Sequence, residues 1–349
     1  MGMSQGWQHA PNRSKKALKA SLLINRRNQS ERMMDLTMLK IREFIKGEDE
    51  ETWLSIRNAA FKEYDDFRPG TMEDMEIWKK DPGFDEVGMF IAELDGKPIG
   101  RIHAYIDKQR KDKKGYIQGL GVIPGFRGRG FGRQLVDKAI ESLKERGVQT
   151  AQTWIRDDKP IAKHIFESSG FKLVRIFSTM RRKLDAIPDN VEKNTDVMLR
   201  AMNEGIGDKK LAWKLNDEAF SEHFDYRPTT LEEWKHWFSH PDFDREGWFI
   251  AFLDGQPVGL VGTWIDSKFV QHTGVKRGWI ETIGVLKPYR RKNIGTSLIL
   301  HGMEHLKSKG MTEVELGVDD LNQTEAIKLY KKVGFQVIRK DLTHQKKIN

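Results

Sequence analysis

An internal duplication constrains the fold of this chain more than any other sequence feature. The tetrapeptide Asp-Phe-Arg-Pro at residues 66–69 returns as Asp-Tyr-Arg-Pro at residues 225–228, and residues 90–100 return at 249–259 with the same offset of 159. Gly170-Phe171 returns later as Gly334-Phe335. A period of this length corresponds to a whole domain and is far longer than a solenoid repeat. The sequence therefore predicts two similar domains in tandem.

The repeat also predicts the domain boundaries. We expect an N-terminal extension over residues 1–37, a first domain over 38–184, a linker over 185–194 and a second domain over 195–349. The second copy has gained about four residues within 267–276, where a loop is expected. The extension has no counterpart in the second copy, and we expect a helix in it around residues 15–24.

Charge and composition exclude several classes of function. The extension holds seven basic and two acidic side chains, and so carries five of the nine net positive charges of the chain. The two domains are only mildly basic, which gives no indication of nucleic-acid binding. The chain has no cysteine, so disulfides, thiolate nucleophiles and cysteine metal sites are excluded, and we expect no metal site. No apolar run approaches the roughly 20 residues that cross a bilayer, which predicts a cytoplasmic protein without a membrane partner.

Each copy repeats the same order of predicted elements. A short strand precedes two helical segments, a hairpin with an Asp-Gly turn, a further strand, a glycine- and arginine-rich loop and a long amphipathic helix. A fifth strand, another helix and a final strand are expected to complete each copy. Strands and helices mixed in this order predict an α+β domain with a central sheet.

The loop between the fourth strand and the long helix is a candidate phosphate site. In the first copy the segment Val-Ile-Pro-Gly-Phe-Arg-Gly-Arg-Gly-Phe-Gly spans residues 122–132, and in the second copy Pro-Tyr-Arg-Arg-Lys-Asn-Ile-Gly spans residues 288–295. A helix N-terminus presents unpaired amides and a partial positive charge, and glycines let the backbone close around an anion. Both loops are therefore predicted to hold a pyrophosphate.

The pattern Arg-x-x-Gly-x-Gly at Arg127, Gly130 and Gly132 resembles the coenzyme A loop of the GNAT acetyltransferases. The resemblance covers both copies and implies two tandem GNAT domains, each with a mixed, mostly antiparallel sheet flanked by helices. In the second copy Asn293 replaces the first glycine of the pattern. Asparagine tolerates a left-handed backbone better than other side chains, so this departure should weaken the loop without abolishing it.

The resemblance implies acetyl-CoA as the cofactor and assigns its binding residues. In the second copy these are Gly284, Val285, Arg290, Arg291, Lys292, Asn293, Ile294, Gly295, Thr296 and Asn322. In the first copy they are Val122, Arg127, Gly128, Arg129, Gly130, Phe131, Gly132 and Arg133.

Two residues of the second copy are candidates for acid and base chemistry. The segment Leu-Tyr-x-x-x-Gly-Phe ending at Phe335 is similar to the GNAT segment whose tyrosine protonates the departing sulfur, which implies that Tyr330 is the general acid. Glu281 lies four residues before Val285 on the fourth strand and would act as the base for the amine. The alternatives are an aromatic anchor for Tyr330 and a paired strand carboxylate for Glu281.

The first copy lacks both groups. It has Phe166 and Gln118 at these positions, and neither side chain transfers protons at neutral pH. The chemistry is therefore expected in the second copy, an arrangement that resembles the two-domain architecture of mycothiol synthases.

The sequence does not identify the acceptor substrate. We expect an amine, either a small molecule or the N-terminus or a lysine of a peptide or protein; a non-catalytic acetyl-CoA-binding regulator is a further alternative. Trp234, Trp237 and Phe238 could line an acceptor pocket, but their helical spacing favours core packing. The repeated Asp-aromatic-Arg-Pro element is expected to cap a helix or to brace the two domains.

Overall fold

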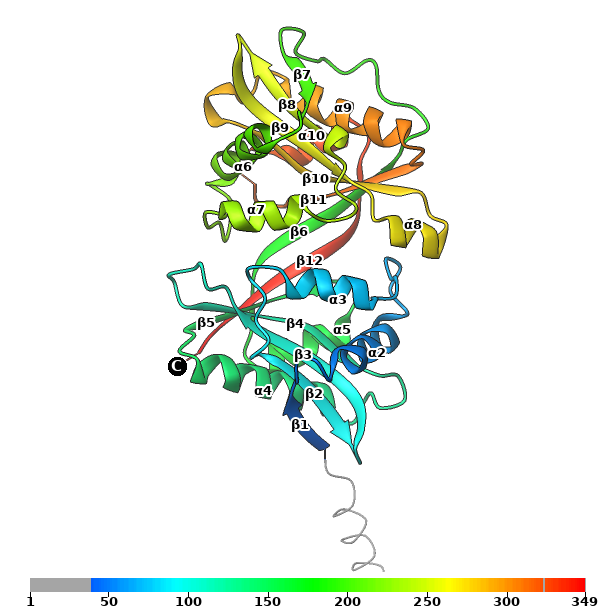
Figure 1. The fold of residues 1–349 in the computed structure, drawn as a ribbon, viewed down its shortest axis with the longest axis vertical. Helices are drawn as coiled ribbons and strands as arrows, with labels where there is room; N and C mark the ends of the chain where they lie inside the picture. Colours follow the sequence, from blue (N-terminus) through cyan, green and yellow to red (C-terminus); the bar gives the residue numbers. More distant parts are fainter. Residues whose placement is uncertain (1–38, 323, 349) are drawn as a thin grey trace, which may run out of the picture.

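The computed structural model describes residues 39–322 and 324–348 (Figure 1). The predicted extension and its helix at 15–24 lie outside the described residues. The elements of the first half are β1 Leu39–Glu43, α2 Glu50–Phe61, α3 Met72–Lys79, β2 Met89–Leu94, β3 Lys97–Ile106, β4 Lys114–Val122, α4 Phe131–Glu145, β5 Thr150–Arg156, α5 Pro160–Ser168 and β6 Lys172–Lys183.

The second half repeats this order, with one additional helix. Its elements are β7 Met198–Ala201, α6 Ile206–Phe220, α7 Leu231–Phe238, β8 Trp248–Leu253, β9 Gln256–Trp264, α8 Ser267–Thr273, β10 Arg277–Val285, α9 Ile294–Ser308, β11 Glu313–Asp319, α10 Ala326–Lys332 and β12 Gln336–Lys347, with short 3-10 turns at Arg245–Gly247 and Lys287–Tyr289. Among the described residues, no helix has the length and apolarity needed to span a bilayer.

All twelve strands join in one continuous sheet, and the two halves exchange their last strands. The strand order is β1-β2-β3-β4-β5-β12-β6-β11-β10-β9-β8-β7. Strand β12, from the end of the chain, pairs with β5 of the first half, while β6 pairs with β11 of the second half. In Figure 1 these two strands cross the middle of the molecule side by side. The sequence analysis expected each copy to end with its own last strand, and it did not foresee this exchange.

The similarity of the two last strands explains why the exchange is possible. Strands β6 and β12 are both 12 residues long and have the same order of exposed, half-buried and buried positions. Either strand therefore presents the same face to a neighbouring edge, and local sequence does not decide which half receives it. Met180 of β6 and Leu184, the residue after it, belong to the core of the second half. Ile348, the residue after β12, belongs to the core of the first half.

Each half packs helices on both faces of its part of the sheet. In the second half, α9 and α10 cover one face through a core that includes Leu298, Met303 and Tyr330. On the other face α6 and α7 pack through Leu215, Trp234 and Phe238. Trp234 and Phe238 of α7 are therefore core residues, and Trp237 packs against them while partly buried, as their spacing favoured.

The insertion in the second copy forms a helix, contrary to the loop expected there. Asp266 caps α8 by accepting a hydrogen bond from the Phe269 amide, Phe269 is buried, and Gly274 ends the helix with a left-handed φ of 72°. The cap, the buried phenylalanine and the terminating glycine together stabilise a helix of only 7 residues. The helix also reaches the first half, where Lys268 bonds Asp74 at 2.9 Å.

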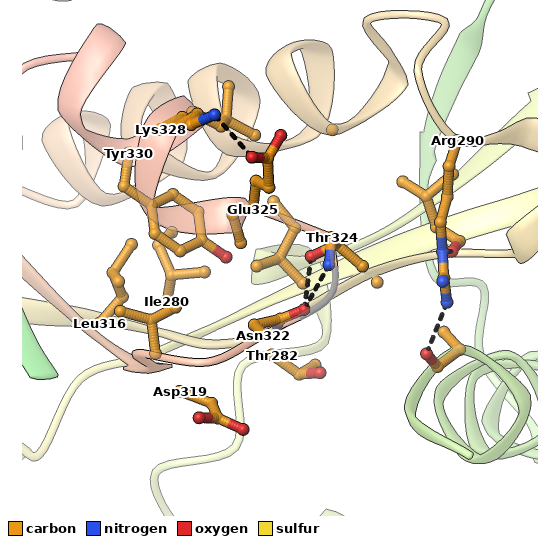
Figure 2. A pocket seen from close by; sticks show the side chains of 18 of the residues that line it. Ile280, Thr282, Arg290, Leu316, Asp319, Asn322, Thr324, Glu325, Lys328 and Tyr330 are labelled. Atoms are coloured by element: carbon orange, nitrogen blue, oxygen red, sulfur yellow. Dashed lines mark hydrogen bonds and ion pairs between the residues drawn. The ribbon is translucent and has the colours of Figure 1, made fainter. Parts of the chain in front are cut away.

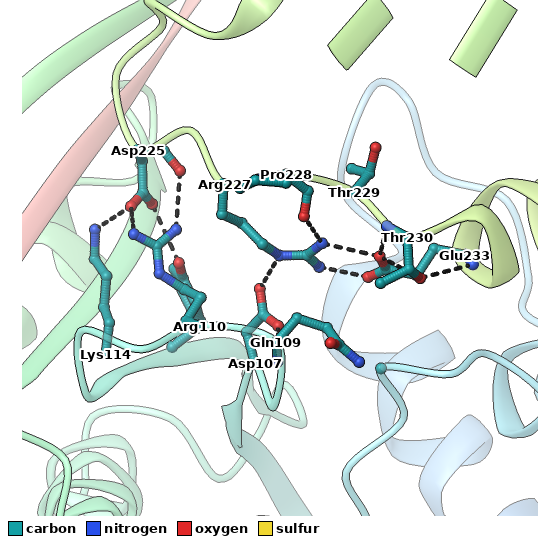
Figure 3. Close-up of polar contacts among 12 residues, drawn as sticks. Asp107, Gln109, Arg110, Lys114, Asp225, Arg227, Pro228, Thr229, Thr230 and Glu233 are labelled. Atoms are coloured by element: carbon teal, nitrogen blue, oxygen red, sulfur yellow. Dashed lines mark hydrogen bonds and ion pairs between the residues drawn. The ribbon is translucent and has the colours of Figure 1, made fainter. Parts of the chain in front are cut away.

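The repeated Asp-aromatic-Arg-Pro element braces the two halves. Arg68 bonds Asp266 of the second half at 2.7 Å, and its counterpart Arg227 bonds Asp107 of the first half at 2.6 Å (Figure 3). Each arginine also pairs with the carboxylate at the third position of the following helix, which is Glu233 in the second half. The element itself therefore braces the two halves, whereas the helix caps are Thr71 and Thr230, whose partner carboxylates the arginines also bind.

Candidate functional site

Two neighbouring strands of the second half separate and open a cleft. Strands β10 and β11 pair in parallel only over Arg277–Ile280 and Glu313–Leu316, although β10 continues to Val285 and β11 to Asp319. The space between the diverging ends forms a cleft of about 480 Å³ (Figure 2). Beyond Ile280 and Leu316, β10 stays paired with β9 and β11 with β6, but the edges of β10 and β11 that face each other are not paired, so their backbone groups are available to a bound molecule.

The loop before α9 has the geometry expected of an anion-binding turn. Asn293, directly before the helix, has a φ of 56°, in the left-handed region, where its counterpart Gly130 has a φ of 81°. Arg291 also has a positive φ of 63° and replaces Gly128 of the first copy. The sequence analysis expected the left-handed backbone at Asn293 but not at Arg291. The first turn of the helix that follows lies at the cleft, because Ile294, Gly295 and Thr296 line it.

Arg290 and Arg127 use their guanidinium groups to fix the loops to the preceding helices. Arg290 donates to the carbonyl oxygens of Val285 at 3.0 Å and Ala219 at 3.1 Å, and it pairs with Glu222 at 2.9 Å. Arg127 makes the equivalent bonds to the carbonyls of Val122 and Ala60 and to Glu63 in the first half. These side chains therefore shape the turn, while only their backbone amides remain for a ligand.

The other loop residues predicted to bind the cofactor lie at or near the two turns. Arg291 is exposed and pairs with Glu325 at 3.0 Å, and Lys292 lies over the Tyr289 ring. In the first half, Arg133 pairs with Asp137, Arg129 lies over the Phe126 ring, and Phe131 packs on the core. Gly295 and Gly132 allow close packing of the following helix, since a Cβ there would meet Leu329 at 3.3 Å or Ile165 at 3.1 Å.

The walls of the cleft fit an extended ligand with a diphosphate at one end. A Cβ on Gly317 of β11 would meet no atom within 4 Å, so this glycine leaves open space inside the cleft. Gly284 of β10 lines the opposite wall, and Asn322, three residues after β11, accepts two bonds from Thr324 at its Oδ1. The residues present therefore fit coenzyme A, with the turn before α9 at the diphosphate end and the separated strands along the remainder.

Tyr330 of α10 reaches the cleft from the core. Its side chain is only 6% exposed and packs beside Phe335, but the residue lines the cleft, and Figure 2 shows its hydroxyl directed into it. Burial raises the pKa of Tyr330 above its usual value, so the hydroxyl keeps its proton at neutral pH. The two alternatives for Tyr330, an aromatic anchor and a proton donor, are therefore compatible, because its ring packs in the core while the residue lines the cleft.

Glu281 lies at a β-bulge of β10. The register with β9 shifts between Ile280 and Thr282, which leaves Glu281 as the additional residue. Its carboxyl group is accessible to solvent within the cleft yet enclosed by the cleft walls, and this enclosure raises the pKa of Glu281. No ion pair involves Glu281 in the part of the chain that the structure describes, which argues against a paired strand carboxylate.

Several residues in or next to the cleft were not predicted from the sequence. Asp319 at the end of β11 is buried and accepts bonds from Arg175 at 2.7 and 2.8 Å, and Phe177 lines the same region. Arg175 and Phe177 both belong to β6, so a strand from the first half of the sequence supplies part of this site. His223 lines the cleft from the end of α6, and burial lowers its pKa. Only the strand exchange brings Arg175 and Phe177 here, and no sequence signal indicates it.

The corresponding positions of the first half are arranged differently. Phe166 is 3% exposed and packs against Phe171 in the core, with no hydroxyl to donate. The Gln118 amide lies 3.3 Å from Nδ1 of His103. The first half therefore repeats the fold of the cleft without its titratable groups.

Comparisons with known proteins agree with this architecture. The family model described as "Acetyltransferase (GNAT) family" matches residues 52–171 and again residues 210–335. A mycothiol acetyltransferase of Acidothermus cellulolyticus is 30% identical over 226 residues, which cover 62% of this chain and 67% of the relative. A mycothiol acetyltransferase of Streptosporangium roseum is 29% identical over 263 residues, which cover 65% of this chain and 76% of the relative.

Solved structures share the whole two-domain fold. A GCN5-related N-acetyltransferase from Sphaerobacter thermophilus has a TM-score of 0.68 and 24% identity, covering 89% of this chain and 96% of that one. A tandem GNAT protein from the clavulanic acid biosynthesis pathway has a TM-score of 0.67 and 15% identity, covering 89% of this chain and 99% of that one. The family model, matched in both copies, together with the separated strands and the turn before the long helix, shows that this chain belongs to the acetyltransferase (GNAT) family as an enzyme with two tandem domains.

Proposed function

We propose that the chain transfers an acetyl group from acetyl-CoA to a primary amine in the cleft of its second half. The observation that carries this proposal is the convergence on one cleft of a helix N-terminal turn, Glu281 and Tyr330. The first half has the turn but not the two titratable groups, which supports a division of labour between the copies. Bound acetyl-CoA would supply the thioester, that is, the acetyl group together with a thiolate leaving group.

The turn before α9 would hold the diphosphate. The amides from Arg290 to Thr296 and the exposed charges of Arg291 and Lys292 provide the positive potential that an anion needs. Amides near Gly284 and Val285, beyond the last paired residue of the parallel ladder, would polarise the acetyl carbonyl.

Glu281 would accept a proton from the attacking amine, directly or through water. A raised pKa makes this carboxylate a stronger base than an ordinary glutamate. Tyr330 would donate its proton to the sulfur as the carbon–sulfur bond breaks and the carbon–nitrogen bond forms. Its raised pKa keeps that proton available at neutral pH.

A small-molecule amine is the acceptor that the relatives favour, because both relatives described above are named mycothiol acetyltransferases. Phe177 and His223 line the same cleft and would contact such a molecule.

Replacement of Tyr330 by phenylalanine tests the proposal. We expect Tyr330→Phe to lower kcat by about 10²–10³, because a positioned acid contributes about 10²–10⁴ in rate, while Tm stays close to wild type since the ring is retained. Steady-state kinetics with acetyl-CoA and a panel of small amines, together with thermal unfolding, provide the measurement. The matched variant Phe166→Tyr should leave the rate unchanged, and undiminished turnover in Tyr330→Phe would refute the assignment of the acid.

A further inference from the structure

A buried arginine without an acidic partner lies in a separate cavity of the first half. Arg101 of β3 is 9% exposed, and its Nε has no hydrogen-bond partner among the described residues. Its one hydrogen bond, to the Trp53 carbonyl oxygen, is long at 3.4 Å, and its Cζ lies 4.3 Å from the centre of the Trp53 ring. Burial lowers the pKa of Arg101 to about 9, with a smaller contribution from the neighbouring charge of Arg57.

The cavity next to Arg101 is large enough for a small organic molecule. It has a volume of about 330 Å³, and its lining includes the indoles of Trp53 and Trp78. Three arginines and one aspartate also line it, namely Arg57, Arg68, Arg101 and Asp74. Arg68 and Asp74 neutralise each other, and Arg57 bonds only neutral oxygens, those of Asn58 and the Arg68 carbonyl. His103 adds no charge at neutral pH, because burial lowers its pKa to about 4. The net potential of the cavity is therefore positive.

The duplicated second half shows that the fold does not need this arginine. The offset of 159 places Leu260 at the position of Arg101, and Leu260 is fully buried. Asn216 stands at the position of Arg57, and the neighbouring strand has Glu281 where the first half has Gln118. One face of the same fold thus carries a carboxylate in the second half and two arginines in the first. Gly119 accommodates the change, since a Cβ there would lie 3.1 Å from the Arg101 guanidinium.

A buried charge without a counterion is costly, because desolvation of one ion costs several kcal/mol after relaxation. A bound anion that accepts bonds from the guanidinium offsets this cost. We propose that the cavity lined by Arg101, Arg57 and Trp53 binds a small organic anion, a carboxylate or phosphate ester whose apolar part packs between the two indoles. This site is distinct from the cleft of the second half and does not depend on the transfer reaction.

The replacement Arg101→Leu tests the proposal, because leucine occupies the same position in the second half. We would titrate the full-length protein with phenylacetate, hexanoate and inorganic phosphate at constant ionic strength, by calorimetry and by thermal unfolding. For at least one of these anions, we expect wild type to bind at one site more than tenfold tighter than Arg101→Leu and to gain Tm, while the variant shows no such gain. Without anion, Arg101→Leu should be as stable as wild type or more stable.

The comparison separates binding beside Arg101 from binding of the same anions elsewhere on the protein. Anions that bind at the N-termini of α4 and α9 affect both proteins equally and cancel in the comparison. The control Arg245→Leu removes a half-exposed arginine of the second half and should keep the wild-type response. The proposal is overturned if every anion acts equally on wild type and Arg101→Leu, or if the variant unfolds at a markedly lower temperature, which would assign Arg101 a structural role.

Discussion

At the scale of single residues, burial raises the pKa of both Tyr330 and Glu281 in the cleft, although the proposal makes one residue a proton donor and the other a proton acceptor. Desolvation disfavours the charged form, and so it raises the pKa of both Tyr330 and Glu281. A raised pKa keeps the proton on the tyrosine, as a donor requires. The same shift makes the glutamate a better base once it is ionised.

The raised pKa of Glu281 predicts a pH dependence of the rate. Activity should fall below a pH set by this carboxyl group, and that pH should lie above the usual pKa of glutamate. Glu281→Gln should lower kcat/KM by about 10²-fold and remove this acidic limb from the profile. A pH profile of kcat/KM for wild type and variant provides the measurement. Gln118→Glu, the matched change in the first half, should leave the profile unaltered; a limb that persists in Glu281→Gln would point to another base.

The variant Glu281→Gln should lose activity but should not lose stability. A carboxyl group whose folded-state pKa is raised contributes stability below its unfolded pKa, and this contribution is lost as the pH rises through the folded pKa. At neutral pH, Glu281→Gln should therefore unfold at an equal or higher temperature than wild type. The pair of measurements separates a catalytic loss from a folding defect.

At the scale of elements, the turn before α9 shows how a glycine-rich loop survives the loss of its glycines. Arg291 and Asn293 occupy left-handed positions that Gly128 and Gly130 hold in the first copy. A left-handed conformation costs an ordinary residue about 1–2 kcal/mol. The three bonds of Arg290 fix the start of the turn and so help to maintain this strain.

Removal of the strain should stabilise the protein. Arg291→Gly should raise the free energy of unfolding by about 0.5–1 kcal/mol, because glycine adopts a positive φ without a Cβ clash but loses more backbone entropy. The exposed ion pair with Glu325 contributes little to this balance. Urea unfolding provides the measurement. Arg291→Ala removes the charge but retains the Cβ, and should therefore show no gain; equal effects of the two variants would attribute the change to charge.

At the scale of the whole molecule, the exchanged strands make the two halves one folding unit. Strand β12 completes the first half beside β5, and β6 completes the second half beside β11. Side chains at the end of each exchanged strand are buried in the other half's core. The strand pairing seen in each half therefore requires the other half.

This arrangement predicts a single cooperative unfolding transition. Differential scanning calorimetry of the full chain should show one peak whose calorimetric and van't Hoff enthalpies agree. A fragment of residues 38–171, which ends before β6, should fail to fold alone, since it has neither β6 nor β12 to cover the edge of β5. Its mixture with a fragment of residues 172–349 should regain structure, as judged by circular dichroism. Two resolved peaks in the full chain, or a stable first fragment, would contradict the prediction.

The duplication let the sequence determine most of the local structure. Hairpins with Asp-Gly turns, the strand before each loop, the long helices and the left-handed position at Asn293 follow from short-range chemistry, and they lie where that chemistry predicted. The missed helix α8 depends on a cap and a buried phenylalanine in a segment too short to give a periodic pattern. Glu281 and Tyr330 could be proposed from the sequence because each stands beside a recognisable element, and both line the cleft.

Only the tertiary structure decided which strand completes which half. Strands β6 and β12 have the same length and the same pattern of burial, so either could pair with either edge at similar local cost. The choice depends on contacts between distant segments, as do the Arg175–Asp319 pair in the cleft and the arginine braces between the halves. The lone charge of Arg101 has the same origin: an arginine in a strand is ordinary in sequence, and only packing shows that it is buried without a counterion.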